Sequence, residues 1–302
     1  MADKTPSTRL YCILARNAPV GIIFRRGPSK RVCLIKWDLK NDTFEVGQWF
    51  KGRIYERRCD LSPNGSKLVY FAAKYKEPIF SWTAVSKPPY LTALMLWEKG
   101  DGWGGGGLFE SEYTLLLNHR PPSEMTLGDD FKMPKDFKVR PFGARSGWGE
   151  DDPICDTRLK RDGWQYIEGK QAKEDYDAKI WIEFNPPITY RKPLSSGHDN
   201  EYYLEMKIAG FKEKGGSWYI TEHDVVNAKT QEALNLGRTE WADWDHNGDL
   251  LYSLEGQLFR LKPSKHKAFC YELKNVQEIA DFSDMEFEEK IAPDWAKKWK
   301  EK

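Results

Sequence analysis

The sequence predicts an all-β protein assembled from a repeated antiparallel unit. Aromatic residues make up 14% of the 302 residues and include 13 tryptophans, and aromatic side chains favour pleated, half-buried strands. Short apolar runs are separated by Gly, Pro, Asn and Asp, which is typical of strands joined by tight turns. Two Asn-Gly pairs, Asn64-Gly65 and Asn247-Gly248, each lie between such runs and indicate β-hairpins.

The first 50 residues predict one four-stranded unit. Asn41-Asp42 is a hairpin signal, because both residues tolerate the backbone conformation of a tight β turn. Four strands in about 40 residues are typical of one blade of a β-propeller. The strands are expected at residues 10–15, 20–25, 32–37 and 43–46.

A second unit is expected between residues 52 and 97. Pro63-Asn64-Gly65 supplies its hairpin turn, and Pro88-Pro89 falls in a connection, where it removes no ladder hydrogen bond. Its strands are expected at residues 53–59, 67–73, 80–85 and 90–97.

Four consecutive glycines follow, at residues 104–107. The run is not a phosphate-binding loop, because no Gly-Lys-Ser/Thr and no helical pattern come after it. We expect the glycines to permit a close approach between backbone segments or a bulge. The alternative is a flexible loop that presents Trp103 to a ligand.

The middle of the chain is irregular. Residues 120–150 are rich in Pro and Gly and are expected to form a loop-rich insertion, which in a compact domain is usually functional or disordered. Trp148 argues against simple disorder. Residues 151–168 predict turns and strand, and 170–177 predict a polar connector with helical character.

Strand patterns then resume, and a unit around Asn247-Gly248 covers residues 240–273. The tail, residues 286–302, carries Pro293 before Asp294-Trp295-Ala296. Because Pro is well suited to the first helical position, we expect a short C-terminal helix there.

One segment resembles a known family. Asp60 to Tyr70, Asp-Leu-Ser-Pro-Asn-Gly-Ser-Lys-Leu-Val-Tyr, is similar to the Ser-Pro-Asp-Gly hairpin of TolB-type and WD-type β-propeller blades, and Asp243 to Tyr252 resembles it more weakly. The resemblance implies a single β-propeller domain over residues 1–302. At roughly 40–50 residues per blade, and with the insertion and the tail set aside, the chain length predicts five or six four-stranded blades. It implies no reaction, because propellers serve as enzymes, scaffolds and receptors.

Charge and cysteine usage limit the function. Lys plus Arg number 47 and Asp plus Glu 46, a net charge of +1, which gives no bulk attraction to nucleic acid or to an anionic membrane. No apolar run reaches the roughly 20 residues needed to span a bilayer, and the first residues lack the apolar core of a signal peptide. Five scattered cysteines without a Cys-x-x-Cys pair predict neither a zinc site nor a redox motif. We expect a cytoplasmic protein with no cofactor.

Catalytic and metal-binding patterns are incomplete. Asp243-x-Asp245-x-Asn247-Gly248 begins like a calcium loop, but Leu254 stands where the bidentate carboxylate belongs, so a hairpin turn is the better interpretation. The five histidines show no paired spacing. Ser195-Ser196-Gly197-His198-Asp199 groups triad residue types, but neighbours in sequence do not form a triad. We therefore assign no metal ligand and no catalytic residue.

The candidate binding residues lie in or beside the loop-rich middle. Trp and Arg carry interface energy more often than other residues, and loops on a rigid scaffold are where binding function concentrates. The expected function is therefore a scaffold that recognises a protein partner or a small-molecule ligand. The alternatives are a propeller hydrolase acting on a sugar or peptide, a passive subunit of a larger assembly, and tryptophans that only cap the core. The candidates are Trp103, Arg145, Trp148, Asp151, Asp152 and Arg158.

Overall fold

The structure is a computed structural model that describes residues 8–27, 30–169, 171–194, 201–264 and 270–299. It divides into two compact units. Unit 1 takes in residues up to Tyr11 together with Lys160–Met285, and unit 2 takes in Cys12–Leu159 together with residues from Glu286 onward. The predicted segment Ser195 to Asp199 lies outside the described residues.

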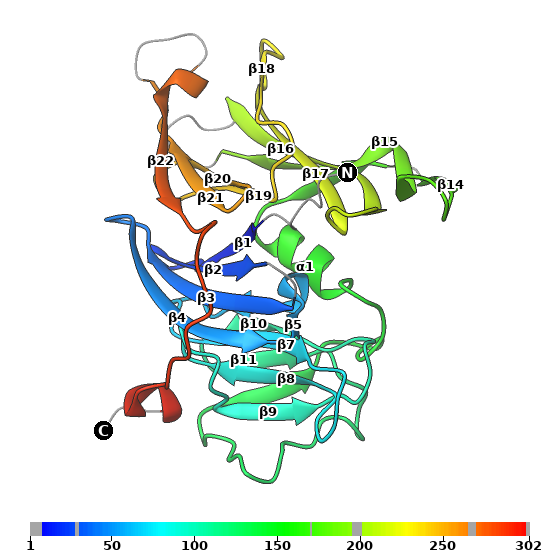
Figure 1. The fold of residues 1–302 in the computed structure, drawn as a ribbon, viewed down its shortest axis with the longest axis vertical. Coiled ribbons are helices and arrows are strands. Elements are labelled where there is room, and N and C mark those ends of the chain that lie inside the picture. The colour runs from blue at the N-terminus through cyan, green and yellow to red at the C-terminus, as the bar shows by residue number, and fades with distance from the viewer. Residues whose placement is uncertain (1–7, 28–29, 170, 195–200, 265–269, 300–302) are drawn as a thin grey trace. The chain divides into compact units, whose positions relative to one another are not determined.

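Five β-sheets of three to six strands make up the described chain (Figure 1), so the all-β prediction is confirmed. In unit 2, which includes β1 from Cys12 onward, the first sheet has the strand order β1-β2-β3-β4 and the second has β5-β7-β8-β9, with β6 beside β7. The third has the order β10-β11-β12, and β12 runs parallel to β11. The bounds are β1 Arg9–Leu14, β2 Val20–Arg26, β3 Arg31–Asp38, β4 Thr43–Lys51, β5 Arg53–Ile54, β6 Asp60–Leu61, β7 Leu68–Ala73, β8 Ser81–Ser86, β9 Met95–Glu98, β10 Gly107–Ser111, β11 Thr114–Leu117 and β12 Lys138–Pro141.

Unit 1 holds the other two sheets. One has the order β13-β15-β16-β17-β18, with β14 also paired to β15, and the other has the order β19-β20-β21-β22. Three of the five sheets are thus dominated by four strands that pair with their neighbours in chain order, which is the topology of a propeller blade. The bounds are β13 Gln165–Glu168, β14 Gln171–Glu174, β15 Ile180–Pro193, β16 Tyr202–Glu213, β17 Tyr219–Asn227, β18 Ala233–Asn235, β19 Trp241–Trp244, β20 Leu250–Leu254, β21 Gln257–Leu261 and β22 Val276–Asp281.

Both Asn-Gly pairs form the predicted turns. Gly65 joins β6 to β7 with φ of +76°, and Gly248 joins β19 to β20 with φ of +84°, a conformation that favours glycine. Asp245 accepts the amides of Asn247 and Asp249 at 2.8 and 2.9 Å and pairs with the guanidinium of Arg260. Its carboxylate therefore closes a hairpin, as the incomplete calcium pattern suggested.

A buried apolar cluster forms the core between the second and third sheets of unit 2. Its members come from β7, β8, β9, β10 and β11, together with the loop before β12. All five cysteines are buried. The cluster comprises Val69, Val85, Met95, Trp97, Phe109, Leu115, Leu117 and Phe137.

Three local predictions were wrong. Residues 154–161 form α1 (Ile154–Arg161) rather than turns and strand, because the Asp152 carboxylate accepts the Asp156 amide at 3.1 Å and caps the first turn. The connector expected to have helical character contains β14, paired to β15. The strand expected at 53–59 ends at Ile54 and continues as the 3₁₀ turn η1 (Glu56–Arg58).

The remaining short turns are η2 (Leu273–Asn275) and η3 (Asp294–Lys297). Pro293 is the N-cap of η3, so the tail does turn helically where the sequence predicts it, in 3₁₀ form. Among the described residues, no helix combines the length and apolarity needed to cross a bilayer. Nor does that part of the chain group three or more His, Cys, Asp or Glu side chains as a metal site.

Candidate functional site

The glycine run brings three backbone segments of unit 2 into close contact. Gly104, Gly105 and Gly106 all have positive φ, between +64° and +78°. A methyl group on Gly105 would lie 2.4 Å from the ring of Phe71, and one on Gly106 would lie 2.1 Å from the carbonyl oxygen of Arg58. These contacts confirm the predicted close approach, since any side chain would collide there.

Residues 99–106 and 143–152 form two loops that are hydrogen-bonded to each other; we call them the recognition loops. The amide of Gly104 donates to the carbonyl of Gly149 at 2.6 Å. Asn118 joins both loops, because its side-chain oxygen accepts the Gly147 amide at 2.7 Å and its carbonyl accepts the Gly105 amide at 2.8 Å. The two loops therefore form one rigid piece of backbone.

Arg58, the last residue of η1, binds both recognition loops. Its guanidinium donates to the carbonyls of Gly102 and Gly104, both at 2.7 Å, and pairs with Asp151 at 3.0 Å. The group also lies over the rings of Tyr55 and Phe71, at 4.5 and 5.2 Å from their centroids. A planar, multidentate cation suits this position, which a lysine would not fill.

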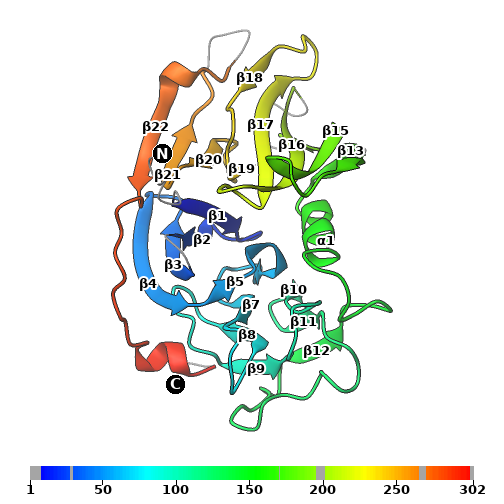
Figure 2. The same ribbon diagram turned by 45° about the vertical axis from the view of Figure 1, so that its right-hand side comes forward.

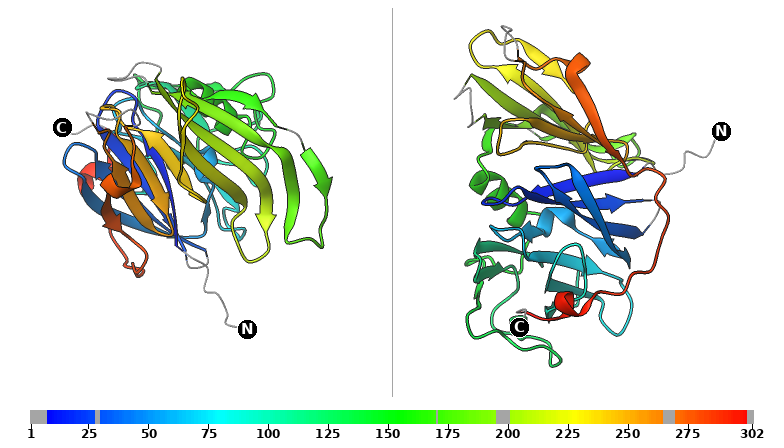
Figure 3. Two further views of the ribbon diagram at one scale, coloured as in Figure 1. Left: turned by 90° about the horizontal axis from the view of Figure 1, so that it is seen from above. Right: turned by 90° about the vertical axis from the view of Figure 1, so that its left-hand side faces the viewer.

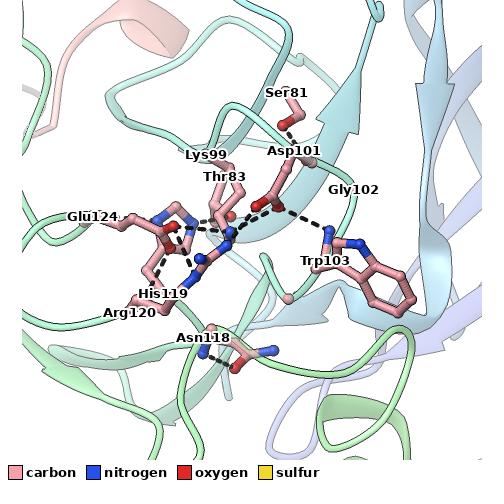
Figure 4. Close-up of polar contacts among 12 residues, drawn as sticks. Ser81, Thr83, Lys99, Asp101, Gly102, Trp103, Asn118, His119, Arg120 and Glu124 are labelled. Atoms are coloured by element: carbon pink, nitrogen blue, oxygen red, sulfur yellow. Dashed lines mark hydrogen bonds and ion pairs between the residues drawn. The ribbon is translucent and has the colours of Figure 1, made fainter.

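An ion network supports the base of the first recognition loop (Figure 4). The side chain of Lys99 is 0% exposed, and its ammonium lies 2.9 Å from Asp101 and 3.1 Å from Glu124. Arg120 contacts both carboxylates, and Asp101 also accepts the amide of Trp103 at 2.9 Å. Although burial alone would raise the pKa of Asp101, the bonds from Lys99 and the Trp103 amide hold it below its ordinary value.

His119 is a structural histidine in this network. Its Nε2 lies 2.8 Å from the Thr83 hydroxyl, and its Nδ1 lies 3.0 Å from the Glu124 carbonyl. The Thr83 oxygen also accepts the Gly106 amide at 2.7 Å, so the hydroxyl proton is directed to Nε2 and the ring is neutral. Burial accordingly lowers the pKa of His119 to about 4.

Two large rings project from this rigid base. Trp103 is 57% exposed and Trp148 is 60% exposed, and the guanidinium of Arg120 lies 5.4 Å over the Trp148 ring. Tyr75 and Phe80 add two further exposed rings, 4.8 Å apart. The Tyr75 hydroxyl is 3.6 Å from the position of a methyl group on Gly102, next to Trp103. We call Tyr75, Phe80, Trp103 and Trp148 the aromatic surface.

The predicted site residues divide into exposed and supporting groups. Trp103, Arg145 and Trp148 are exposed on the recognition loops. Asp151 holds Arg58, and Asp152 caps α1. Arg158 is 3% exposed and donates to the carbonyls of Glu56 and Cys59. Eight residues of the site were not predicted from the sequence: Arg58, Lys99, Asp101, His119, Arg120, Glu124, Tyr75 and Phe80. For Lys99 and Asp101 the sequence offers one signal, since both lie next to the glycine run.

No protein-family model matches the sequence, and a search of curated proteins finds no match. The chain is similar to a solved structure, the β-propeller domain of the Trilobed protease from Pyrococcus furiosus, described as revealing an open velcro topology. The identity is 10% and the TM-score 0.31, with 92% of this chain and 100% of that chain covered. We draw nothing about the fold, the residues or the activity of this chain from a similarity of this size.

Proposed function

We propose that the chain is a binding protein built from propeller-type blades, and that it recognises a protein partner through the aromatic surface of unit 2. The observation that carries this proposal is the exposure of Trp103 and Trp148, at 57% and 60%, on loops that are fixed to each other. Arg145, exposed on the second loop, supplies a flanking cation. Five or six blades and a cytoplasmic location remain part of the proposal; five scattered cysteines, an odd number without a Cys-x-x-Cys pair, suit a reducing compartment.

The energetics favour recognition. An exposed indole keeps much of its apolar area in water, and burying it against a partner recovers about 25 cal/mol for each Å². Trp side chains at the centre of an interface commonly contribute about 2 kcal/mol or more each. Because the backbone of both loops is already ordered, binding costs little additional conformational entropy. Rings displayed on separate loops suit a protein partner, whereas a small ligand requires a concave site.

The chemistry beneath the surface is structural. Asp101 and Glu124 are each paired with Lys99 and Arg120. The pKa of Asp101 is lowered, which makes that carboxyl a poor general acid. Thr83 and His119 are both 0% exposed. These contacts beneath the aromatic surface do not favour the alternative of a sugar or peptide hydrolase.

Affinity capture with matched variants tests the proposal. The wild type, the Trp103→Ala/Trp148→Ala double variant and a Tyr113→Ala control are each used to capture partners from the native host, followed by mass spectrometry. Tyr113 is an equally exposed ring (53%) outside the aromatic surface. We expect a partner that the wild type and the control retain and the double variant loses. Equal retention by all three would refute the aromatic surface as the recognition site.

A further inference from the structure

The C-terminal residues of unit 2 cross its three sheets as an extended strap. Residues 286–299 belong to no strand and contain only the short turn η3. The segment runs outside β4 and on past the second sheet (Figures 2 and 3). It is attached at three places, one on each sheet, and we call it the strap.

The first attachment is on the edge strand β4. The carbonyl of Lys290 accepts the side-chain amide of Gln48 at 2.9 Å, and the Lys290 ammonium donates to the carbonyl of Val46 at 2.9 Å. The ring of Phe287 lies 6.0 Å from that of Trp49. These are side-chain contacts, so the strap does not continue the sheet.

The second attachment is on the connection between β8 and β9. Trp295 meets the ring of Tyr90 edge-on at 5.5 Å, and its carbonyl accepts the Lys87 ammonium at 3.1 Å. Ala296, in the same turn, is completely buried. The helical turn therefore buries a small residue and packs a ring against the connection between β8 and β9.

The third attachment is on the buried apolar cluster between the second and third sheets. Trp299 packs against the core cluster and lies 4.7 Å from the ring of Phe137. The Lys67 ammonium lies 5.2 Å from the centroid of the Trp299 ring. A ring from the strap thus covers side chains that would otherwise face water.

The strap has two distinct faces. Phe287, Lys290 and Trp299 contact the first sheet and the core cluster, and Ala296 is buried, whereas Ile291 is 84% exposed. An extended segment held by a few anchors in separate pockets binds in the manner of a peptide ligand, in which a few side chains supply most of the affinity.

We propose that the surface under the strap is a peptide-docking site, which the chain fills with its own residues 286–299 and which accepts the same segment from a second copy. The site consists of Gln48 and Trp49 on the first sheet, Tyr90 on the second and Phe137 beside the third. This site shares none of these residues with the aromatic surface, and the inference does not depend on the proposed function.

Cleavage of the full chain tests this inference. A protease recognition sequence is inserted between Met285 and Glu286, and the purified protein is cut while it remains folded. We expect the cut protein to release its strap on dilution and to bind a fluorescent peptide of residues 286–302 saturably. The intact protein should not bind the peptide, because its own strap fills the site.

Peptide variants show whether the docked geometry is the one described. Trp299→Ala and Phe287→Ala should each weaken binding by about tenfold, because both remove an anchoring ring, whereas Ile291→Ser should leave it unchanged. A cut protein that unfolds, or that fails to bind the peptide, would overturn the inference.

Hydrogen exchange on the intact chain tests the same inference without cleavage. Exchange should be about tenfold faster in the strap than in β7 and β8, since local opening needs less energy than global unfolding. Equal protection of the strap and of these strands would also overturn the inference.

Discussion

Replacing Lys99 by methionine should loosen the base of the first recognition loop. The ammonium of Lys99 is completely buried and makes ion pairs of 2.9 and 3.1 Å with Asp101 and Glu124. Removing one partner of a buried ion pair costs about 3–5 kcal/mol, because the remaining charges stay desolvated. The carboxylates here are 36% and 16% exposed, so water screens part of their charge and we expect the lower end, about 3 kcal/mol.

Native-state hydrogen exchange is the appropriate assay, because it measures the free energy of opening segment by segment in a chain with two compact units. Amides of residues 99–107 should lose protection in Lys99→Met by about 3 kcal/mol, or about a hundredfold in exchange rate. Lys297→Met is the matched control, since Lys297 pairs with Asp294 on the surface and such pairs contribute about 0.5 kcal/mol at most. Unchanged protection of residues 99–107 in Lys99→Met would refute a stabilising role for the network.

Three further predictions concern pH and the glycine run. Burial raises the pKa of Glu240 to about 7 from 4.5, so the folded state binds its proton more tightly. The stability of unit 1 should therefore fall by about 3 kcal/mol between about pH 5 and about pH 8, and Glu240→Gln should remove that slope from unfolding curves measured against pH. Burial lowers the pKa of His119 to about 4 from 6.5, so the unfolded chain binds this proton at a higher pH than the folded chain does. The free energy of unfolding of unit 2 should therefore fall by about 3 kcal/mol as the pH falls from about 6.5 to about 4, and His119→Gln should remove most of this pH dependence. Gly106→Ala, which places a methyl group 2.1 Å from the Arg58 carbonyl at a φ of +76°, should lower the stability by about 3 kcal/mol or more in thermal unfolding. Gly143→Ala, which meets nothing within 4 Å, should stay within about 0.5 kcal/mol, and equal effects of the two would contradict the close-packing account.

Much of the fold follows from local chemistry that the sequence displays. The four strands β1 to β4 appear as apolar runs between turn residues, and both Asn-Gly hairpins form where positive φ is required. The glycine run pointed to a close backbone approach, which the structure places against Phe71 and Arg58.

The two wrong predictions at α1 and β14 have physical reasons. The helix α1 is only eight residues long, and its sequence, Ile-Cys-Asp-Thr-Arg-Leu-Lys-Arg, has few apolar residues. A helix this short depends on its surroundings, here including the Asp152 carboxylate that accepts the Asp156 amide in its first turn. The strand β14 is polar and gains its stability from pairing with β15, a tertiary effect that local propensity does not contain.

The sequence predicts the exposed residues of the candidate site but not the ion network that supports them. Exposed Trp103 and Trp148 could be predicted, because each lies between glycines in a loop-rich stretch. The network beneath them could not, since Glu124 and Arg120 lie in a different segment from Lys99 and Asp101 and only the fold brings their charges together.

The most direct test of the central claim is oxidative footprinting of the wild-type protein with its captured partner. Side chains at the centre of an interface lose nearly all contact with water, so oxidation of Trp103 and Trp148 should fall by about tenfold on complex formation. Tyr113, which lies outside the aromatic surface, should be oxidised at the same rate with and without the partner. A complex in which Trp103 and Trp148 remain as reactive as in the free protein would contradict the account.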